Sequence, residues 1–261
     1  TFVAPTVSVN AFNSLQNKNE IYYALFEPNL YPRWFGNVKK YKINSTGAIL
    51  DAGMDLETTT KANDAIDDDT GYFDSSAYSF WTDGSSFPAD HPTGQGDGFQ
   101  VNLGGAASRL DTTRTVYTLA NKAPGPDREN NIDINSNANN LISVASIGTL
   151  ASIGTNDISS SLFGIDTTQT STEIHADRTE VINWILGIDV KDVDEDTDFI
   201  EASRFMSDPL HSRPTVVTYG GTEDNPDDTL FSIDNGGAFR AIDTDNGEEL
   251  FAFIPPELLK N

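Results

Sequence analysis

Four short β-prone runs near the C-terminal end constrain the fold of this 261-residue chain more than any other feature. They lie at residues 214–219, 229–233, 238–242 and 250–254. The segments between them contain Asn235-Gly236 and Asn246-Gly247, and such pairs favour tight turns because both positions tolerate a positive φ. The pattern predicts an antiparallel four-stranded meander. A sheet this small cannot bury both faces by itself, so we expect other β-sheets to pack against it.

The rest of the chain predicts further strands separated by long polar insertions. Short apolar runs at residues 21–26, 38–43 and 48–51 indicate strands, and Gly47 in Asn44-Ser45-Thr46-Gly47 suits a hairpin turn. Residues 56–175 are rich in turn-forming types, with strands expected only near residues 99–103 and 115–119. The sequence therefore predicts a mainly β fold with long loop insertions and a few short helices.

One of those helices is expected at residues 177–187. Asp177 and Glu180 have the spacing of a capping box, and Gly187 is a suitable terminator. The apolar residues between them predict that this helix is short and mostly buried.

The charge balance excludes one class of partner. The chain has 40 acidic and 16 basic residues, for a formal net charge of −24, so it repels phosphate backbones and we expect no nucleic-acid binding. Two explanations of the acidity stay open: solubility in an extracellular or salty medium, or neutralisation by bound divalent cations. Without cysteine there are no disulfides, thiolate metal sites or cysteine nucleophiles. An export signal, if the protein has one, is expected upstream of Thr1.

An acidic segment at residues 189–198 is the strongest candidate site. Carboxylates at alternating positions allow a tight loop to direct several oxygens at one centre, as Ca²⁺ requires. The spacing is not that of an EF-hand, because a loop beginning at Asp192 has no glycine at its sixth position and has Ser203 at its twelfth. The alternative is a solvated acidic loop. The predicted calcium ligands are Asp189, Asp192, Asp194, Asp196 and Asp198.

Other oxygen-rich clusters are weaker candidates. The first contains Asp64, Asp67, Asp68, Asp69 and Asp74, and the second contains Asp133, Asn135 and Asn137. Both patterns are equally typical of exposed turns. The three histidines are not at metal-ligand spacing, and we expect His211 to bond to the backbone. Because no nucleophile elbow, phosphate loop or dinucleotide fingerprint occurs, the chain is not expected to be an enzyme.

Several segments, in order along the chain, resemble the C-terminal region of PilY1-type proteins, the tip adhesins and assembly factors of type IV pili. Residues 207–214 resemble the family's GDPLHSRP, residues 233–243 its NDGxLHAFD, and residues 247–255 its GxELFAFIP. Upstream, residues 34–41 resemble WxGNLKKY. Shorter matches occur at Gly104 to Ala107 and at Arg114 to Thr118. The chain departs from the family at Ser207, Gly237 and Arg240, which stand where other residues are usual.

The resemblance implies part of a β-propeller built from antiparallel four-stranded blades. In that interpretation residues 1–19 are an N-terminal extension, residues 20–206 a strand-and-loop region with insertions, and residues 207–261 a blade. It also implies a calcium-binding fimbrial protein exported through the outer membrane, acting in pilus assembly, extension and cell adhesion. Its partners would be minor pilins at the pilus tip and a host or abiotic surface. The chain then represents a fragment or an unusually short relative.

Two alternatives stay open. One is a structural, filament-forming extracellular subunit that self-associates through exposed strand edges. Residues 241–247 also resemble a blade segment of quinone-dependent propeller dehydrogenases, but only one such segment occurs and residue 251 is Phe.

Overall fold

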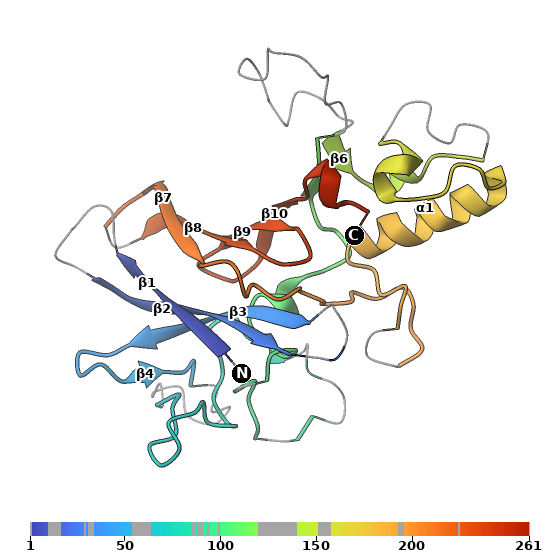
Figure 1. Cartoon of the computed structure of the whole chain (residues 1–261). Helices are drawn as coiled ribbons and strands as arrows, with labels where there is room; N and C mark the ends of the chain where they lie inside the picture. The colour runs from blue at the N-terminus through green and yellow to red at the C-terminus, as the bar shows by residue number, and fades with distance from the viewer. Residues whose placement is uncertain are drawn as a thin grey trace. The chain divides into compact units, whose positions relative to one another are not determined.

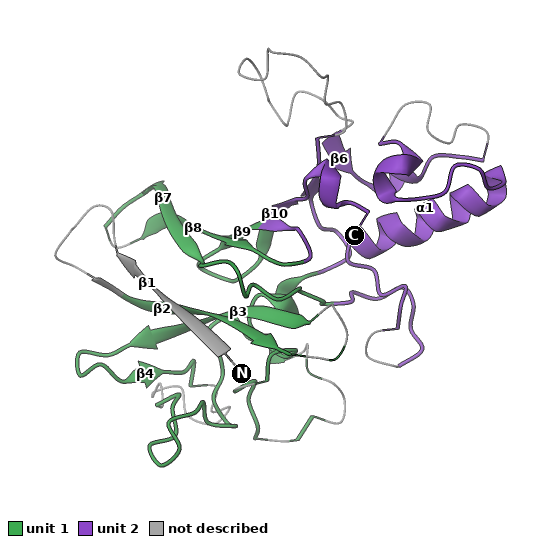
Figure 2. Cartoon of the chain, in the orientation of Figure 1, with its two compact units in different colours: residues 1–110, 204–235, 240–250 green, residues 111–203, 236–239, 251–261 purple. Residues whose placement is uncertain are grey.

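The fold is given by a computed structural model, which for residues 2–9, 17 and 18 describes only the backbone. The residues described are 2–9, 17–28, 30, 34–53, 64–84, 87, 91–92, 94–98, 100–119, 140–150, 158–192, 196–223 and 225–260. The chain is mainly β (Figure 1). It divides into two compact units (Figure 2). Unit 1 comprises residues 1–110, 204–235 and 240–250, and unit 2 comprises residues 111–203, 236–239 and 251–261.

The first sheet is an antiparallel sheet in unit 1 with the order β1-β2-β3-β4. Its strands are β1 (Phe2–Val9), β2 (Asn17–Glu27), β3 (Phe35–Ile43) and β4 (Ile49–Leu50). Residues 1–19, interpreted from sequence as an extension, thus include a strand that pairs with β2. The β3–β4 hairpin turns at the predicted position, where Gly47 has φ of +88°.

The second sheet has the order β6-β5-β10-β9-β8-β7. Its strands are β5 (Val116–Tyr117), β6 (Leu141–Ile142), β7 (Thr215–Gly221), β8 (Pro226–Ile233), β9 (Phe239–Asp243) and β10 (Glu249–Phe253). The predicted meander is present as β7 to β10, each strand next to its neighbour in sequence, and β5 joins β10 in parallel. Over the described residues both sheets are open, and neither a closed barrel nor a propeller is formed.

The helix α1 (Ser171–Ile185) begins earlier than the sequence analysis expected. Its N-cap is Thr170, whose side-chain oxygen accepts from the Glu173 amide, while the Glu173 carboxylate accepts from the Thr170 amide and hydroxyl. The N-cap of this capping box lies about two turns before Asp177, which is therefore inside the helix. The predicted end is confirmed, because Gly187 follows the C-cap Leu186 with φ of +86°.

Short 3₁₀ helices complete the regular structure. They are η2 (Ala107–Arg109), η4 (Val144–Ile147), η5 (Ser160–Phe163) and η6 (Pro256–Leu258).

The meander buries one face against the other sheet within unit 1. Leu230 of β8 and Ile242 of β9 share a core with Tyr22, Val38 and Trp81. A neighbouring core in the same unit contains Ile21, Tyr23, Leu25, Tyr41, Ala65, Ala77 and Val101. The small size of the meander predicted this packing of one sheet on another.

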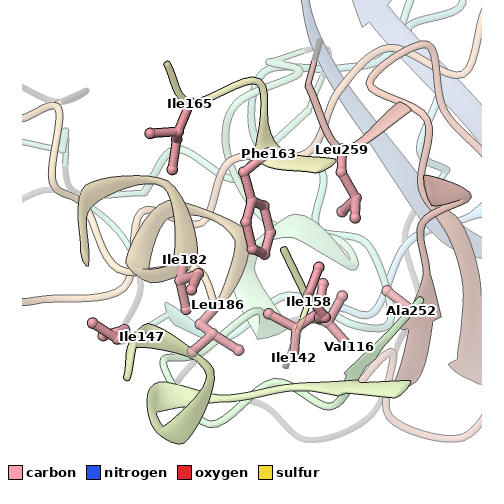
Figure 3. Close-up of a cluster of buried hydrophobic side chains, with 10 residues drawn as sticks. All are labelled: Val116, Ile142, Ile147, Ile158, Phe163, Ile165, Ile182, Leu186, Ala252 and Leu259. Carbon is pink, nitrogen blue, oxygen red and sulfur yellow. The ribbon is translucent and has the colours of Figure 1, made fainter. Parts of the chain in front are cut away.

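Unit 2 has a separate core in which a helix takes part. Ile182 of α1 and the C-cap residue Leu186 lie with Phe163, Ile158 and Ile142 (Figure 3). The same cluster includes Val116 of β5 and Ala252 of β10, so this end of the second sheet is packed against helical residues.

Residues 100–103, the described part of the strand expected at 99–103, do not form a strand. The described part of this segment is a series of turns, although Val101 and Leu103 are buried. Its carbonyl groups accept hydrogen bonds from side chains of β3 instead of from another strand. Side-chain donors already satisfy these buried carbonyl groups, so they do not need hydrogen bonds from a neighbouring strand. The buried segment can therefore remain irregular.

Candidate functional site

The predicted calcium ligands lie on a loop of unit 2 whose two ends are joined by backbone contacts. We call residues 188–202 the acidic loop. Ile188 and Ala202 form an antiparallel bridge, and the Asp189 amide donates to the Glu201 carbonyl at 2.9 Å. The Ser203 amide donates to the Gly187 carbonyl, also at 2.9 Å. The loop therefore begins where α1 ends and closes on itself before the chain continues to β7.

Each described aspartate of this loop accepts a hydrogen bond from a backbone amide. Asp192 Oδ1 accepts from Thr197 at 2.9 Å, Asp196 Oδ1 from Asp198 at 2.7 Å, and Asp198 Oδ1 from Ile200 at 3.0 Å. Asp189 is buried and accepts from Lys191 at 3.3 Å. Asp194 lies outside the described residues.

These contacts fix the path of the loop and keep carboxylate groups at the surface. Asp192 and Thr197 have left-handed φ values of 52° and 72°, which the bond between them helps to hold. Asp196 and Asp198 are exposed. The loop's lysine, Lys191, forms an ion pair with Glu180 of α1. A bound cation would reduce the repulsion among the remaining carboxylates.

The described residues do not by themselves form a preassembled metal centre. Among them, no three His, Asp or Glu side chains are grouped closely enough to hold one ion. The calcium assignment thus stays a prediction, and it requires Asp194 and a rearrangement of the turns around Asp192 and Asp196.

The weaker candidates are turns where the structure describes them. Asp67 Oδ1 accepts from the amides of Asp69 and Thr70, and the Thr70 contacts hold the pKa of Asp67 below its usual value. Asp74 accepts from the amide and hydroxyl of Ser76, which likewise lower its pKa. The second cluster, Asp133, Asn135 and Asn137, lies outside the described residues.

The histidine expectation was wrong in one detail. His211 Nδ1 lies 3.0 Å from Asn235 Oδ1, so its partner is a side-chain amide and not the backbone. Asn235 in turn donates to the buried Asp208 carboxylate at 2.5 Å. This chain of contacts joins the segment before β7 to the turn between β8 and β9.

A buried ion pair in unit 1 was missed by the sequence analysis. Lys39 Nζ lies 2.8 Å from Asp97 Oδ2, and both side chains are fully buried. The ammonium also donates to the carbonyls of Asp97, Gly98 and Gln100 at 3.0, 3.2 and 2.7 Å. Burial lowers the pKa of Lys39, and the Asp97 carboxylate opposes that shift. The available signal was the group of three lysines, Lys39, Lys40 and Lys42, within the predicted strand at residues 38–43.

A second buried cation in unit 1 is held by two carboxylates. Arg240 Nε lies 2.9 Å from Asp234 Oδ2, and its Nη1 pairs with Glu249. Burial disfavours the arginine charge, but Glu249 and Asp234 outweigh it and raise the pKa of Arg240. Each of these residues lies in a segment that resembles the PilY1-type family.

The family-like segments also contact one another within unit 1. Asn37 Nδ2 donates to the Gly104 carbonyl at 2.9 Å, and Asn37 Oδ1 accepts from the Ala107 amide at 3.0 Å. The Gly36 amide donates to the Met206 carbonyl at 2.8 Å. A Cβ at Gly36 would lie 2.3 Å from the Ser207 carbonyl oxygen, so only glycine permits this approach.

Two further contacts extend the same network to the β9–β10 turn. Lys40 Nζ and Trp81 Nε1 donate to the Thr244 carbonyl at 2.7 and 3.0 Å. A Cβ at Gly247 would lie 2.5 Å from Trp81 Cγ. Most residues that carry the resemblance therefore have structural roles in unit 1. The acidic loop remains the candidate site for binding an ion.

Comparison of the chain with family models, curated proteins and solved structures gives no match. Within the described part of the chain, no helix has the length and the apolar character needed to cross a membrane.

Proposed function

We propose that this chain is part of a calcium-binding cell-surface protein of type IV pili that acts in pilus assembly, extension and adhesion. In this proposal the two open sheets are pieces of a β-propeller, the minor pilins at the pilus tip are its partners, and a host or abiotic surface is its target. The protein acts outside the outer membrane and without catalysis.

The supporting observation is that separate segments resembling the family are joined by one network of hydrogen bonds. Residues 34–41, 104–107, 207–214 and 233–243 are distant in sequence, yet they are joined through Asn37, the bridge between Phe35 and Ser207, and Asn235. A resemblance to one domain of the family requires that these segments lie in one structural unit, and all of them except residues 236–239 lie in unit 1. The contacts therefore support treating the resemblance as that of one structural unit.

Calcium has a defined place in this proposal. The acidic loop is closed at its base and exposes Asp196 and Asp198, so bound Ca²⁺ would order the loop and would activate no nucleophile. Ordering a surface loop changes what a partner can bind, which is how calcium would regulate extension and retraction.

Calorimetry with charge-removing variants tests calcium binding directly. Asn retains the Oδ1 acceptor that holds each turn, so Asp192→Asn with Asp196→Asn removes charge and leaves the backbone contacts in place. Asp166→Asn is the matched control, because Asp166 accepts from Thr168 in the same way at an exposed turn of unit 2. We expect the double variant to bind Ca²⁺ at least about tenfold more weakly. Equal affinity in all three proteins contradicts the site.

A piliation assay tests the biological part. Replacement of Asp192, Asp194 and Asp196 by Ala in the full-length protein is expected to alter pilus extension or retraction. Normal piliation and retraction with a protein that has lost calcium binding would rule out the regulatory role. Quinone-supported dye reduction by the purified chain would instead support the dehydrogenase alternative.

The exposed side chains of β7 favour one alternative function. β7 is the terminal strand of the second sheet, and its Val217 and Tyr219 are 37% and 65% exposed. Terminal strands with apolar side chains pair readily with other chains. A filament-forming subunit would use this strand, and electron microscopy of the purified chain distinguishes filaments from a soluble fragment.

A further inference from the structure

The β3–β4 hairpin carries a glycosylation sequence in a reactive geometry. Asn44-Ser45-Thr46 is the one Asn-x-Ser/Thr triplet of the sequence, x being any residue but proline. Ser45, Thr46 and Gly47 are exposed, and a Cβ built at Gly47 has no atom within 4 Å. The tip of the hairpin is therefore accessible to a modifying enzyme.

The asparagine side chain is held by three hydrogen bonds to a single oxygen. Asn44 Oδ1 accepts from the Thr46 hydroxyl at 2.7 Å and from the amides of Thr46 and Ala48, both at 2.9 Å. Among the described residues no hydrogen bond from Asn44 Nδ2 is present, so this nitrogen is available for reaction. The Asn44 carbonyl also accepts from the Gly47 amide at 3.0 Å, which fixes the turn.

This arrangement favours reaction at Nδ2. An amide nitrogen is a poor nucleophile because its lone pair is delocalised onto the carbonyl oxygen. Donors directed at Oδ1 stabilise the negative charge that develops there when Nδ2 loses a proton. The hydroxyl of Thr46 supplies one of these donors, which gives a physical role to the third residue of the triplet.

We propose that Asn44 is an acceptor of N-linked glycosylation. The bond formed joins Asn44 Nδ2 to C1 of a sugar, and the bond broken joins C1 to the phosphate oxygen of an activated glycosyl donor. The phosphate or diphosphate group leaves with the electron pair of that bond, and a base of the glycosylating enzyme takes up the proton lost from Nδ2. The donor is a polyprenyl-linked or a nucleotide-linked sugar phosphate, which share this chemistry. The inference rests on the proposed function only for exposure of the protein to such enzymes at a cell surface.

Two reactions in vitro distinguish the donors. The purified chain is incubated with an oligosaccharyltransferase and a polyprenyl-diphosphate glycan, or with a soluble N-glycosyltransferase and a nucleotide-activated hexose. We expect intact-mass spectrometry to show addition of one glycan in at least one reaction, located at Asn44 by peptide mapping. No addition in either reaction overturns the inference, whether or not the chain belongs to a pilus.

Three variants separate chemistry from folding. Asn44→Asp keeps the Oδ1 acceptor and removes the nucleophilic nitrogen, so we expect complete loss of modification at an unchanged melting temperature. Thr46→Val keeps the side-chain shape and removes the hydroxyl, and we expect loss of modification here too. Ser45→Ala is the control and should be modified like the wild type. Full modification of the Thr46→Val variant would overturn the role of the hydroxyl and, with it, the argument from geometry.

Discussion

Three buried carboxylates of unit 1 and the carboxylates of the acidic loop in unit 2 have different partners. In unit 1 the buried carboxylates of Asp97, Asp234 and Glu249 are each paired with a buried cation of the same chain. In unit 2 the carboxylates of Asp192 and Asp196 in the acidic loop accept hydrogen bonds from backbone amides. The three carboxylates of unit 1 thus have counter-ions within the chain, whereas the exposed carboxylates of the acidic loop are accessible to an external one.

The largest expected effect tests the internal counter-ion of unit 1. Lys39→Met leaves the Asp97 carboxylate buried without its ammonium, and removing one partner of a buried pair costs about 3–5 kcal/mol of unfolding free energy. Chemical denaturation measures the change. Lys42→Met is the control because Lys42 is exposed, and its effect should be below about 1 kcal/mol. Equal losses in the two variants would contradict a special role for the pair.

Removal of Arg178 sharpens the comparison. Its guanidinium donates to the carbonyls of Ile147 and Ile158 at 3.1 and 3.0 Å, and to Ser160 Oγ at 3.1 Å. Arg178→Met leaves these buried oxygens without their donors, so we expect a loss of about 2–3 kcal/mol of unfolding free energy. The same denaturation measurement gives the value. A loss below about 1 kcal/mol would contradict a structural role for these hydrogen bonds.

Calcium should affect the two units unequally. A calcium concentration ten times the dissociation constant stabilises the folded protein relative to the unfolded chain by about 1.4 kcal/mol. We expect slower hydrogen exchange in residues 188–202 and no change at Lys39 and its carbonyl partners. If a chelator leaves hydrogen exchange in the acidic loop unchanged, the result would support the solvated-loop interpretation. A change of hydrogen exchange in unit 1 would contradict the difference between the units.

The helix cap gives a smaller effect, confined to unit 2. Thr170→Ala removes the N-cap of α1 and should cost about 1 kcal/mol. Asp177→Asn, at the N-cap expected from sequence, is the control and should change the stability little. Thermal unfolding followed by circular dichroism measures both, and the reverse order would restore the helix start at Asp177.

The smallest effect is a pH dependence shared by the exposed turns of both units. Hydrogen bonds from Thr70 hold the pKa of Asp67 below its ordinary value of about 4, and bonds from Thr168 do the same for Asp166. A depressed pKa in the folded state means that the stabilisation is present above the unfolded pKa. It is lost as the pH falls from about 4 through the folded pKa. Carboxylate titration by NMR should give values below 4 for both residues.

Local chemistry made several elements predictable from sequence. The meander, the Gly47 turn and the end of α1 at Gly187 depend on neighbouring residues, because turns and caps are decided within about one turn of chain. The start of α1 was missed although Thr170 and Glu173 carry the same spacing as Asp177 and Glu180. Two capping boxes with equally suitable residues could begin the helix, and the sequence pattern does not show which of them is used.

The sequence by itself determined that this chain is β-rich, acidic and punctuated by tight turns, since these properties follow from composition and from short-range spacing. Only the tertiary structure decided which charges are buried. Lys39 meets the Asp97 carbonyl across 58 residues, and Lys40 meets the Thr244 carbonyl across 204. No local pattern encodes such a partner, because the free energy of a buried charge depends on the oxygens that the folded chain places around it.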